Sequence, residues 1–140
     1  MTFRWQANFK RWNDALQTKD AKTVANMYVP SELSFLPTVS PKHIKGYDNT
    51  KEYFESFVQK NPFGTITDDS VQAYSSDAYL HSGMYTFELG EAGARTPVQA
   101  RFSYVWRQIN GDWKIAHHHS SVRPAEPDML EVARVSFFDL

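Results

Sequence analysis

Residues 97–120 read PVQARFSYVWRQINGDWKIAHHHS and contain two segments of alternating polar and apolar residues. In the first segment, Pro97–Gln108, every second residue is apolar, which is typical of a β-strand with one buried face. Its apolar face consists of Val98, Ala100, Phe102, Tyr104 and Trp106. The Asn110-Gly111 pair favours a two-residue hairpin turn, so Trp113–Ser120 is predicted to pair with the first segment as an antiparallel strand.

The sequence before residue 97 predicts three helices and three further strands. Apolar residues recur at helical spacing in the helices, and β-branched and aromatic residues dominate the strands. Helices are expected over Thr2–Thr18, from a cap at Asp20 to Tyr28, and over Asn49–Gln59 behind a cap at Asp48. Strands are expected over Ser34–Leu36, Thr65–Tyr74 and Ala78–Leu89. Helices followed by strands indicate an α+β domain, in which helices cover one face of an antiparallel sheet.

Length and composition describe a single domain over residues 1–140. The chain is 41% apolar, and its formal net charge is −1, without the basic surplus that attracts nucleic acid or an anionic membrane. The absence of cysteine excludes disulfides and thiolate metal sites, and no apolar run approaches the ~20 residues that span a bilayer. We therefore expect a soluble, cytoplasmic protein with no nucleic-acid and no membrane partner.

The last segment, residues 122–140, contains two prolines and then a series of apolar residues. These residues are Leu130, Val132, Val135, Phe137 and Phe138. Because so many apolar side chains are unfavourable in water, we expect this segment to dock as a tail on another surface.

Several motifs are shared with one known family. They are Gly46-Tyr47-Asp48, Glu52-Tyr53-Phe54-Glu55, Val105-Trp106 and the run Asn110–Ser121, with its pattern Gly-x-Trp-x-Ile-x-His-x-His-x-Ser. In the order and spacing of these motifs, the chain from about Trp5 to Ser121 resembles the association (hub) domain of calcium/calmodulin-dependent protein kinase II. It also resembles the stand-alone relatives of that domain, within the nuclear transport factor 2-like and SnoaL-like superfamily.

This resemblance implies a cone-shaped fold, a barrel-like arrangement in which N-terminal helices close the concave face of a strongly curved antiparallel sheet around a pocket. In the kinase hub, the opposite face of the sheet forms dimers that assemble into rings. SnoaL-like relatives include enzymes that act on small hydrophobic substrates inside the pocket. Membership of the superfamily therefore predicts the fold better than it predicts the function.

The pocket of this chain differs from the pocket of the kinase hub. The hub pocket is lined by arginines, whereas the aligned positions here are Tyr104 and Ser120, with a third near Met84. The glycine-rich and catalytic loops of protein kinases are absent from the sequence, which excludes kinase activity. We therefore expect a small neutral or weakly polar ligand to bind better than a small carboxylate.

The predicted ligand pocket combines aromatic walls with one polar end. Its residues are Phe35, Phe54, Met84, Phe102, Tyr104, His118 and Ser120. His118 and Tyr104 are the candidate catalytic residues, because they can exchange or donate protons on the pocket side. The alternative is that His118, Tyr104 and Ser120 satisfy one another's hydrogen bonds inside a core. A β-bulge in either strand would turn its later side chains to the other face.

The other face of the predicted sheet has the mixed composition of a protein interface, although the protein's own tail could cover it instead. The candidate interface residues are Arg101, Ser103, Trp113, Ile115 and His117. Strand alternation puts Trp113 and Ile115 on the same face as His117 and His119. His117 and His119 lack an evident third ligand, so neither a metal nor another cofactor is expected.

Together these observations predict a homo-oligomerising, small-ligand-binding domain without kinase activity, which pairs with itself as a homodimer or a larger ring. Twenty-one aromatic residues, the mixed sheet face and the apolar tail exceed what a monomer is expected to leave in water. The alternative function is a SnoaL-like pocket enzyme, an isomerase, cyclase or hydrolase, that uses His118 and Tyr104 on a small hydrophobic substrate. An enzyme would have a titratable group facing an open cavity, whereas side chains would fill this space in a structural hub.

Overall fold

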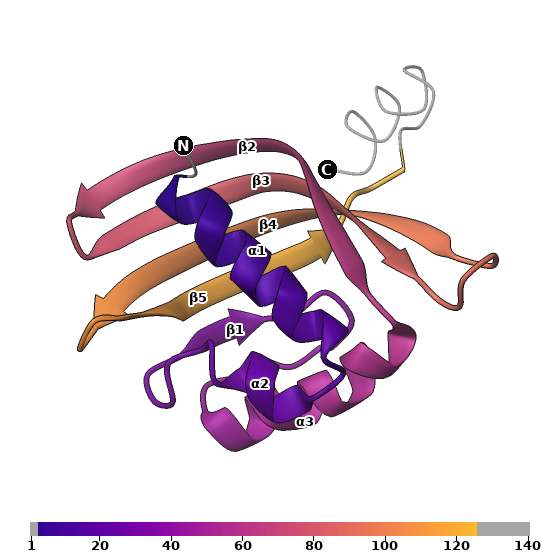
Figure 1. Cartoon of the computed structure of the whole chain (residues 1–140), viewed down its shortest axis with the longest axis horizontal. Helices are drawn as coiled ribbons and strands as arrows, with labels where there is room; N and C mark the ends of the chain where they lie inside the picture. Colours follow the sequence, from indigo (N-terminus) through magenta and orange to yellow (C-terminus); the bar gives the residue numbers. More distant parts are fainter. Residues whose placement is uncertain (1–2, 126–140) are drawn as a thin grey trace, which may run out of the picture.

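The computed structural model of the chain describes residues 3–125, which form a curved five-stranded sheet with helices packed against it (Figure 1). The helices are α1 (Arg4–Gln17), α2 (Ala21–Ala25) and α3 (Tyr47–Phe57), and α3 continues into the 3₁₀ turn η1 (Val58–Lys60). The strands are β1 (Ser34–Leu36), β2 (Phe63–Ser75), β3 (Ala78–Leu89), β4 (Thr96–Ile109) and β5 (Asp112–Val122). The predicted α+β class is therefore confirmed.

The strand order in the sheet is β1-β5-β4-β3-β2. β2, β3, β4 and β5 are antiparallel neighbours, as the sequence predicts. β1 instead runs parallel to β5 and pairs Ser34 with His117 and Leu36 with His119. The sheet is therefore mixed, and the sequence did not predict this parallel pair. A parallel pair requires a long connection, and α3 together with three strands separates β1 from β5 along the chain.

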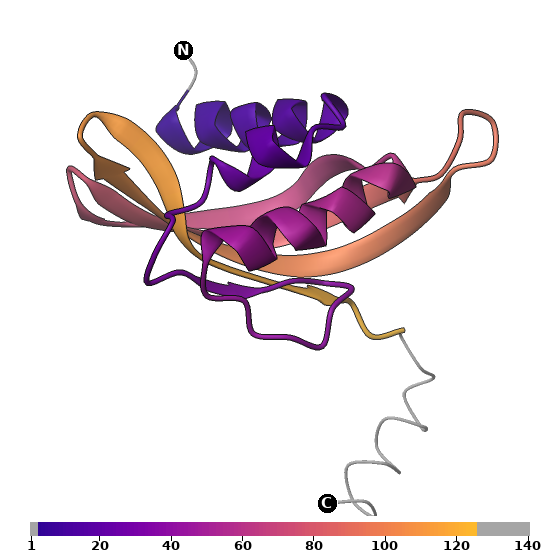
Figure 2. The ribbon, with the colours of Figure 1, turned by 90° about the horizontal axis from the view of Figure 1, so that it is seen from below.

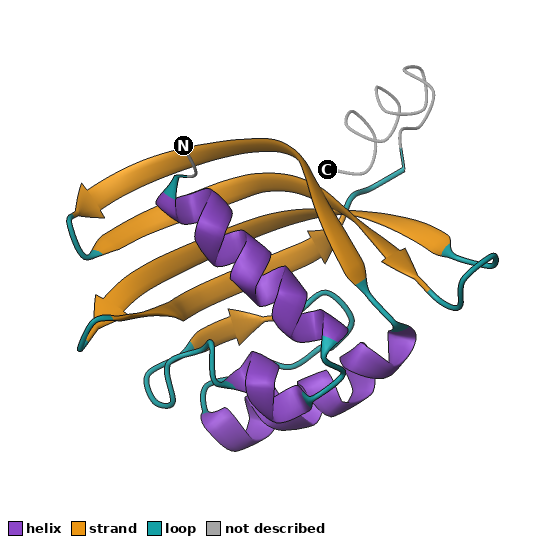
Figure 3. Cartoon of the chain, in the orientation of Figure 1, coloured by secondary structure: helices purple, strands orange, loops and turns teal. Residues whose placement is uncertain are grey.

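The sheet bends around α1 without closing into a barrel (Figures 1 and 2). α1 crosses the concave face of the sheet, while α2 and α3 lie near its β1 end. β-Bulges interrupt the pairing of β2 with β3 between Ile66 and Asp68, and that of β4 with β5 between Val105 and Trp106. Bulges increase local twist and bend the strands. No helix or strand of residues 3–125 covers the convex face (Figure 3).

The core between α1, α3 and the concave face is mainly aromatic. Trp12 of α1 is buried and packs edge-on against Phe87, Tyr104 and His118, with ring centroids 5.6–6.0 Å apart. Such edge-to-face contacts are favourable beyond the apolar area that they bury. Trp5, near the start of the same helix, is only partly buried.

The end of α2 and the cap of α3 differ from the sequence prediction. α2 ends at Ala25 rather than at Tyr28, because the backbone around Tyr28 pairs with Ile115 of β5 instead of continuing the helix. The N-cap of α3 is Gly46 and not Asp48. Asp48 lies in the first turn of α3, where its negative charge faces the positive end of the helix dipole.

The described chain ends just beyond β5. The Arg123 amide still donates to the Gln99 carbonyl, so the pairing of β5 with β4 continues one residue past Val122. The predicted docking tail, residues 122–140, lies outside the described residues from residue 126 onward. No helix within residues 3–125 is long and apolar enough to cross a bilayer.

Candidate functional site

The concave face brings together six of the seven residues predicted for the pocket, and all six are buried. They are Phe35 on β1, Phe54 on α3, Phe102 and Tyr104 on β4, and His118 and Ser120 on β5. The seventh residue, Met84, belongs to the opposite face, because it pairs in register with the exposed Arg101. Its neighbour Tyr85 takes the buried position instead, since side chains alternate along β3.

One extra residue in β5 changes which side chains face the core. His117 pairs with Val105 whereas Ile115 pairs with Trp106, so Ala116 is the bulged residue between them. Ile115 and Trp113 consequently lie on the concave side and are buried. Their predicted place beside His117 on an interface is wrong, because strand alternation does not carry through a bulge.

A chain of hydrogen bonds runs through the aromatic core. Trp12 Nε1 donates to the Tyr28 hydroxyl over 3.1 Å, and this hydroxyl lies 2.8 Å from His118 Nδ1. On the other side of the ring, His118 Nε2 lies 3.4 Å from the Tyr85 hydroxyl. The Tyr85 hydroxyl in turn donates to Ser120 Oγ over 2.6 Å. Three elements, α1, β3 and β5, and the segment around Tyr28 are thus joined through one imidazole.

The donors along this chain determine the protonation of His118. Because the Tyr85 proton is used for Ser120, Tyr85 accepts from His118, and Nε2 therefore carries the ring proton. Nδ1 then accepts the proton of Tyr28. Burial lowers the pKa of His118 well below its usual value, and the two neighbouring histidines add to this effect. The imidazole is neutral, and both of its nitrogens have partners.

The hydroxyl groups around His118 are neutral as well. Burial raises the pKa of Tyr28, Tyr85 and Tyr104. Tyr104 stacks on the His118 ring with 4.1 Å between centroids, and Thr38 donates from the loop after β1 to the Ser120 hydroxyl. The site is therefore an uncharged polar chain enclosed by aromatic rings.

Little space remains beside His118. The cavity there has a volume of about 10 Å³, scarcely enough for one water molecule. Its walls include Trp12, Tyr85, His118 and Ser120, together with aromatic rings of β1, β3 and α3. General acid–base chemistry requires a substrate within hydrogen-bond reach of the catalytic group. His118 and Tyr104 have suitable chemistry, but side chains fill the place that a substrate would occupy.

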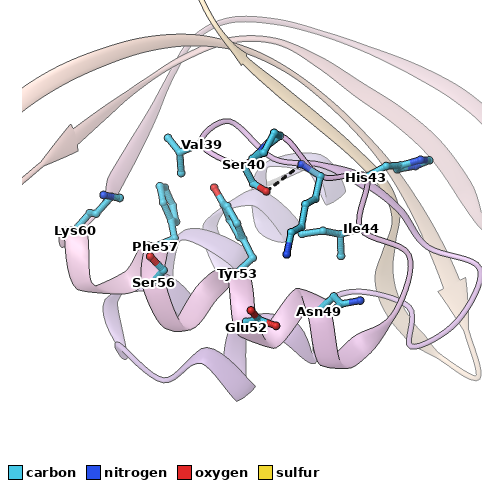
Figure 4. A pocket seen from close by; sticks show the side chains of 12 residues that line it. Val39, Ser40, His43, Ile44, Asn49, Glu52, Tyr53, Ser56, Phe57 and Lys60 are labelled. Atoms are coloured by element: carbon cyan, nitrogen blue, oxygen red, sulfur yellow. Dashed lines mark hydrogen bonds between the residues drawn. The ribbon is translucent and has the colours of Figure 1, made fainter.

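A larger cleft of about 400 Å³ opens on the surface next to this core (Figure 4). It lies between residues 39–44 and one side of α3, and Tyr53 and Phe57 separate it from the small cavity. Burial raises the pKa of Tyr53. Sequence reasoning missed this cleft because it considered only the buried side of α3. The sequence feature that indicates the cleft is a second stripe of residues at helical spacing, formed by Asn49, Glu52, Ser56 and Lys60.

The convex face of the sheet carries the other interface candidates. Ser103 pairs with His119, and Arg101 pairs with Ser121, so these side chains form neighbouring rows across β4 and β5. Arg101 is exposed, whereas Ser103 and His117 are half-buried. Three of the five predicted interface residues, Arg101, Ser103 and His117, therefore share one face.

Histidines gather at the β1 edge of this face. His43 Nε2 lies 3.0 Å from the Ser34 hydroxyl, and Ser34 pairs with His117. Burial lowers the pKa of His117, with smaller contributions from His119 and His43. In the part of the chain that the structure describes, no three His, Asp or Glu side chains are arranged to hold a metal ion.

The curved sheet and the helices on its concave side have the fold of nuclear transport factor 2-like proteins. A protein of this superfamily from Salmonella enterica superposes with a TM-score of 0.70 and 21% identity, over 88% of this chain and 90% of that one. A protein from Streptomyces avermitilis, provisionally described as a dehydratase of this class, gives 0.72 and 16%, over 87% and 95%. At these identities, the likeness shows the fold alone.

A more specific match covers most of the chain. The family model of the calcium/calmodulin dependent protein kinase II association domain matches residues 6–124. A solved protein from Xanthomonas campestris, provisionally described as such a domain, is 37% identical over 86% of each chain, with a TM-score of 0.82. The chain belongs to the calcium/calmodulin-dependent protein kinase II association domain family, which confirms the resemblance seen in its motifs.

Proposed function

We propose that this protein is an association domain that forms homo-oligomers through the convex face of its sheet. The observation that carries this proposal is the asymmetry of the sheet. Its concave face is packed against helices, whereas no element of residues 3–125 covers the convex face (Figure 2). A sheet with one bare face either keeps that face polar or covers it with a partner.

The composition of the convex face supports a partner rather than water. Leu80 of β3 pairs with Val105 of β4, which pairs with His117 of β5, and these three side chains are only partly exposed. The adjacent row contains Ser82 and Ser103, whose small side chains would allow a second sheet to approach closely. A row of small and apolar groups across the middle of a sheet suits a packed interface.

The charges on this face suit pairing of identical copies. Arg101 of β4 and Asp68 of β2 both pair with Met84, so a positive and a negative group lie in the same row, separated by one strand. A two-fold interface brings the same patch of two subunits together and requires this patch to be complementary to itself. A face with both signs of charge meets that requirement better than a face with one sign.

The small cavity beside His118 gives no comparable support to ligand binding or to catalysis. Ligand binding and catalysis both require space beside His118, and the space there is about 10 Å³. The hydrogen bonds of His118 are instead complete within the protein. The proposed function therefore rests on the outside of the sheet.

Sedimentation velocity of the wild type and of Ser103→Glu tests this proposal. Ser103→Glu places a charge and three additional side-chain atoms in the centre of the convex face, so we expect this variant to sediment as a 16.2 kDa monomer. The wild type is expected to sediment as a dimer or a larger species. Ala7→Glu adds the same charge at an exposed position of α1 and is the matched control.

Two results would contradict the proposal: a monomeric wild type, or loss of the oligomer in Ala7→Glu as well as in Ser103→Glu. Far-UV circular dichroism and a thermal unfolding curve of each variant show whether the sheet still folds. Because Ser103 faces outward, both variants should retain a wild-type spectrum.

A further inference from the structure

The surface cleft along α3 has the features of a binding site for an apolar, acidic segment. Tyr53, Phe57 and Ile44 supply apolar walls, and the charged lining residues are two lysines, Lys42 and Lys60, and one glutamate, Glu52. The aromatic rings of Tyr53 and Phe57 lie side by side in the cleft, with Lys60 at one end (Figure 4). A volume of about 400 Å³ corresponds to a few side chains of a peptide.

The cleft lies at the end of the sheet where β5 leaves it. β1 and β5 are parallel, and Leu36, the last residue of β1, pairs with His119. The chain therefore leaves both strands at the same end of the sheet. Thr38, next to the cleft residue Val39, is hydrogen-bonded to Ser120. Residues that follow β5 thus begin beside one wall of the cleft.

Apolar side chains are exposed at the edge of the cleft and at the end of β5. Val39, at the edge of the cleft, is 50% exposed, and Val122, the last residue of β5, is 52% exposed. Burial of such side chains beneath a further segment would be favourable, because it removes apolar surface from water.

The sequence beyond the described residues is complementary to the cleft. Residues 126–140 read EPDMLEVARVSFFDL, with four acidic residues and one arginine, a net charge of −3. Residues 1–125 contain 14 basic and 12 acidic residues, a net charge of +2. Phe137 and Phe138 can supply apolar contacts, and the adjacent Asp139 can supply a charge. Fifteen residues reach up to roughly 50 Å when extended, which is ample for a return to the cleft.

We propose that residues 126–140 of the chain bind in the cleft of the same subunit. Phe137 and Phe138 occupy the apolar space against Tyr53 and Phe57, and the acidic residues approach Lys42 and Lys60. Tyr53 and Phe57, the rings contacted in this arrangement, separate the cleft from the small cavity beside His118. This inference does not depend on the oligomeric state of the protein.

Paramagnetic broadening in the full chain tests this proposal. The chain has no cysteine, so Ser136→Cys provides a single attachment point for a spin label. We expect the amide signals of Ile44, Tyr53 and Phe57 to lose most of their intensity. The signals of Leu80 and Ser103, on the convex face, should keep theirs. The same sample with a reduced, diamagnetic label gives the reference intensities.

Further samples identify what occupies the cleft. Phe137→Ser/Phe138→Ser in the labelled chain should restore the signals of the cleft, whereas Val132→Ser, which also removes one apolar side chain, should restore them less. Broadening of the convex face, or no local broadening, would overturn the proposal. A mixture of spin-labelled protein and isotope-labelled protein without a spin label should show no broadening, because broadening there would assign the cleft to a tail from another subunit.

These outcomes are distinct from the test of the proposed function. A monomeric wild type removes the proposed association but leaves broadening of the cleft as expected. An oligomeric wild type whose cleft signals are not broadened supports the proposed association and contradicts the tail proposal. If the cleft signals remain sharp, the cleft is free for a separate ligand and the tail proposal is wrong.

Discussion

The two faces of the sheet use the same strands in opposite ways. On the concave face, Phe102, Tyr104 and His118 are buried, and their rings are stacked or tilted against one another. On the convex face, Arg101 and Ser103 alternate with Phe102 and Tyr104 along β4; Arg101 is exposed and Ser103 is half-buried. The concave face therefore forms the packed core, whereas no helix or strand of residues 3–125 covers the convex face. This division follows from the two-residue period of a β-strand.

The largest effect is expected where the concave face leaves no room for a methyl group. A Cβ atom on Gly83 would lie 2.0 Å from the Asp68 carbonyl oxygen and 2.7 Å from Asp69 Cα. Because both contacts are with backbone, β2 would have to move, and Gly83→Ala should lower the free energy of unfolding by about 3 kcal/mol. Urea denaturation measures this change.

Ser82→Ala is the matched control on the same strand, because Ser82 faces the convex side. It should alter the free energy of unfolding by less than about 0.5 kcal/mol. Equal effects of Gly83→Ala and Ser82→Ala would show that β2 and β3 do not approach as closely as the structure indicates.

The next effect is expected from the hydrogen-bond chain of the concave face. Tyr28→Phe removes one hydroxyl and leaves both Trp12 Nε1 and His118 Nδ1 buried without a partner. We expect a loss of about 2–3 kcal/mol in the free energy of unfolding. Tyr74→Phe removes a hydroxyl from a side chain that is 61% exposed and should be nearly neutral in the same measurement. A neutral Tyr28→Phe would mean that water replaces the missing hydroxyl.

The pH dependence of stability tests the neutrality of His118. Burial holds its pKa in the folded state below the value of about 6.5 in the unfolded state. The unfolded chain therefore binds the proton first as the pH falls. The stabilisation is present above pH 6.5 and is lost on acidification, by up to about 1.4 kcal/mol for each pH unit.

His118→Phe should reduce this slope, measured as urea midpoints at several pH values between 7.5 and 5. Ser120→Ala retains the imidazole and should retain the slope. His117 also has a pKa lowered by burial, so part of the slope should remain in His118→Phe. An unchanged slope in His118→Phe would show that His118 is not the group that takes up the proton.

The smallest effect is expected at the hairpin turn between β4 and β5, which fixes the register of these two strands. Asn110 and Gly111 have φ angles of +52° and +84°, which are the left-handed values required by a type I′ hairpin. Gly111→Val should destabilise the protein by about 1 kcal/mol, because a β-branched residue is strained there. Thermal unfolding measures the loss, and an unchanged midpoint would show that the turn tolerates another conformation.

The local patterns of the sequence determined most of the elements of this fold. Alternation of apolar residues located β4, and the Asn110-Gly111 pair located its hairpin with β5. The same alternation correctly placed Phe102 and Tyr104 on the buried face. These features depend on residues close together in the chain, so the sequence alone was sufficient to predict them.

Long-range pairing decided what the sequence left open. The bulge at Ala116 put Trp113 and Ile115 on the concave side, although simple alternation predicts the opposite. β1 joined β5 in a parallel pair, and the cleft formed between α3 and the loop that follows β1. The space beside His118 was set by how closely α1, α3 and the sheet pack. Register, strand direction and free volume arise from contacts between distant residues, which no local pattern specifies.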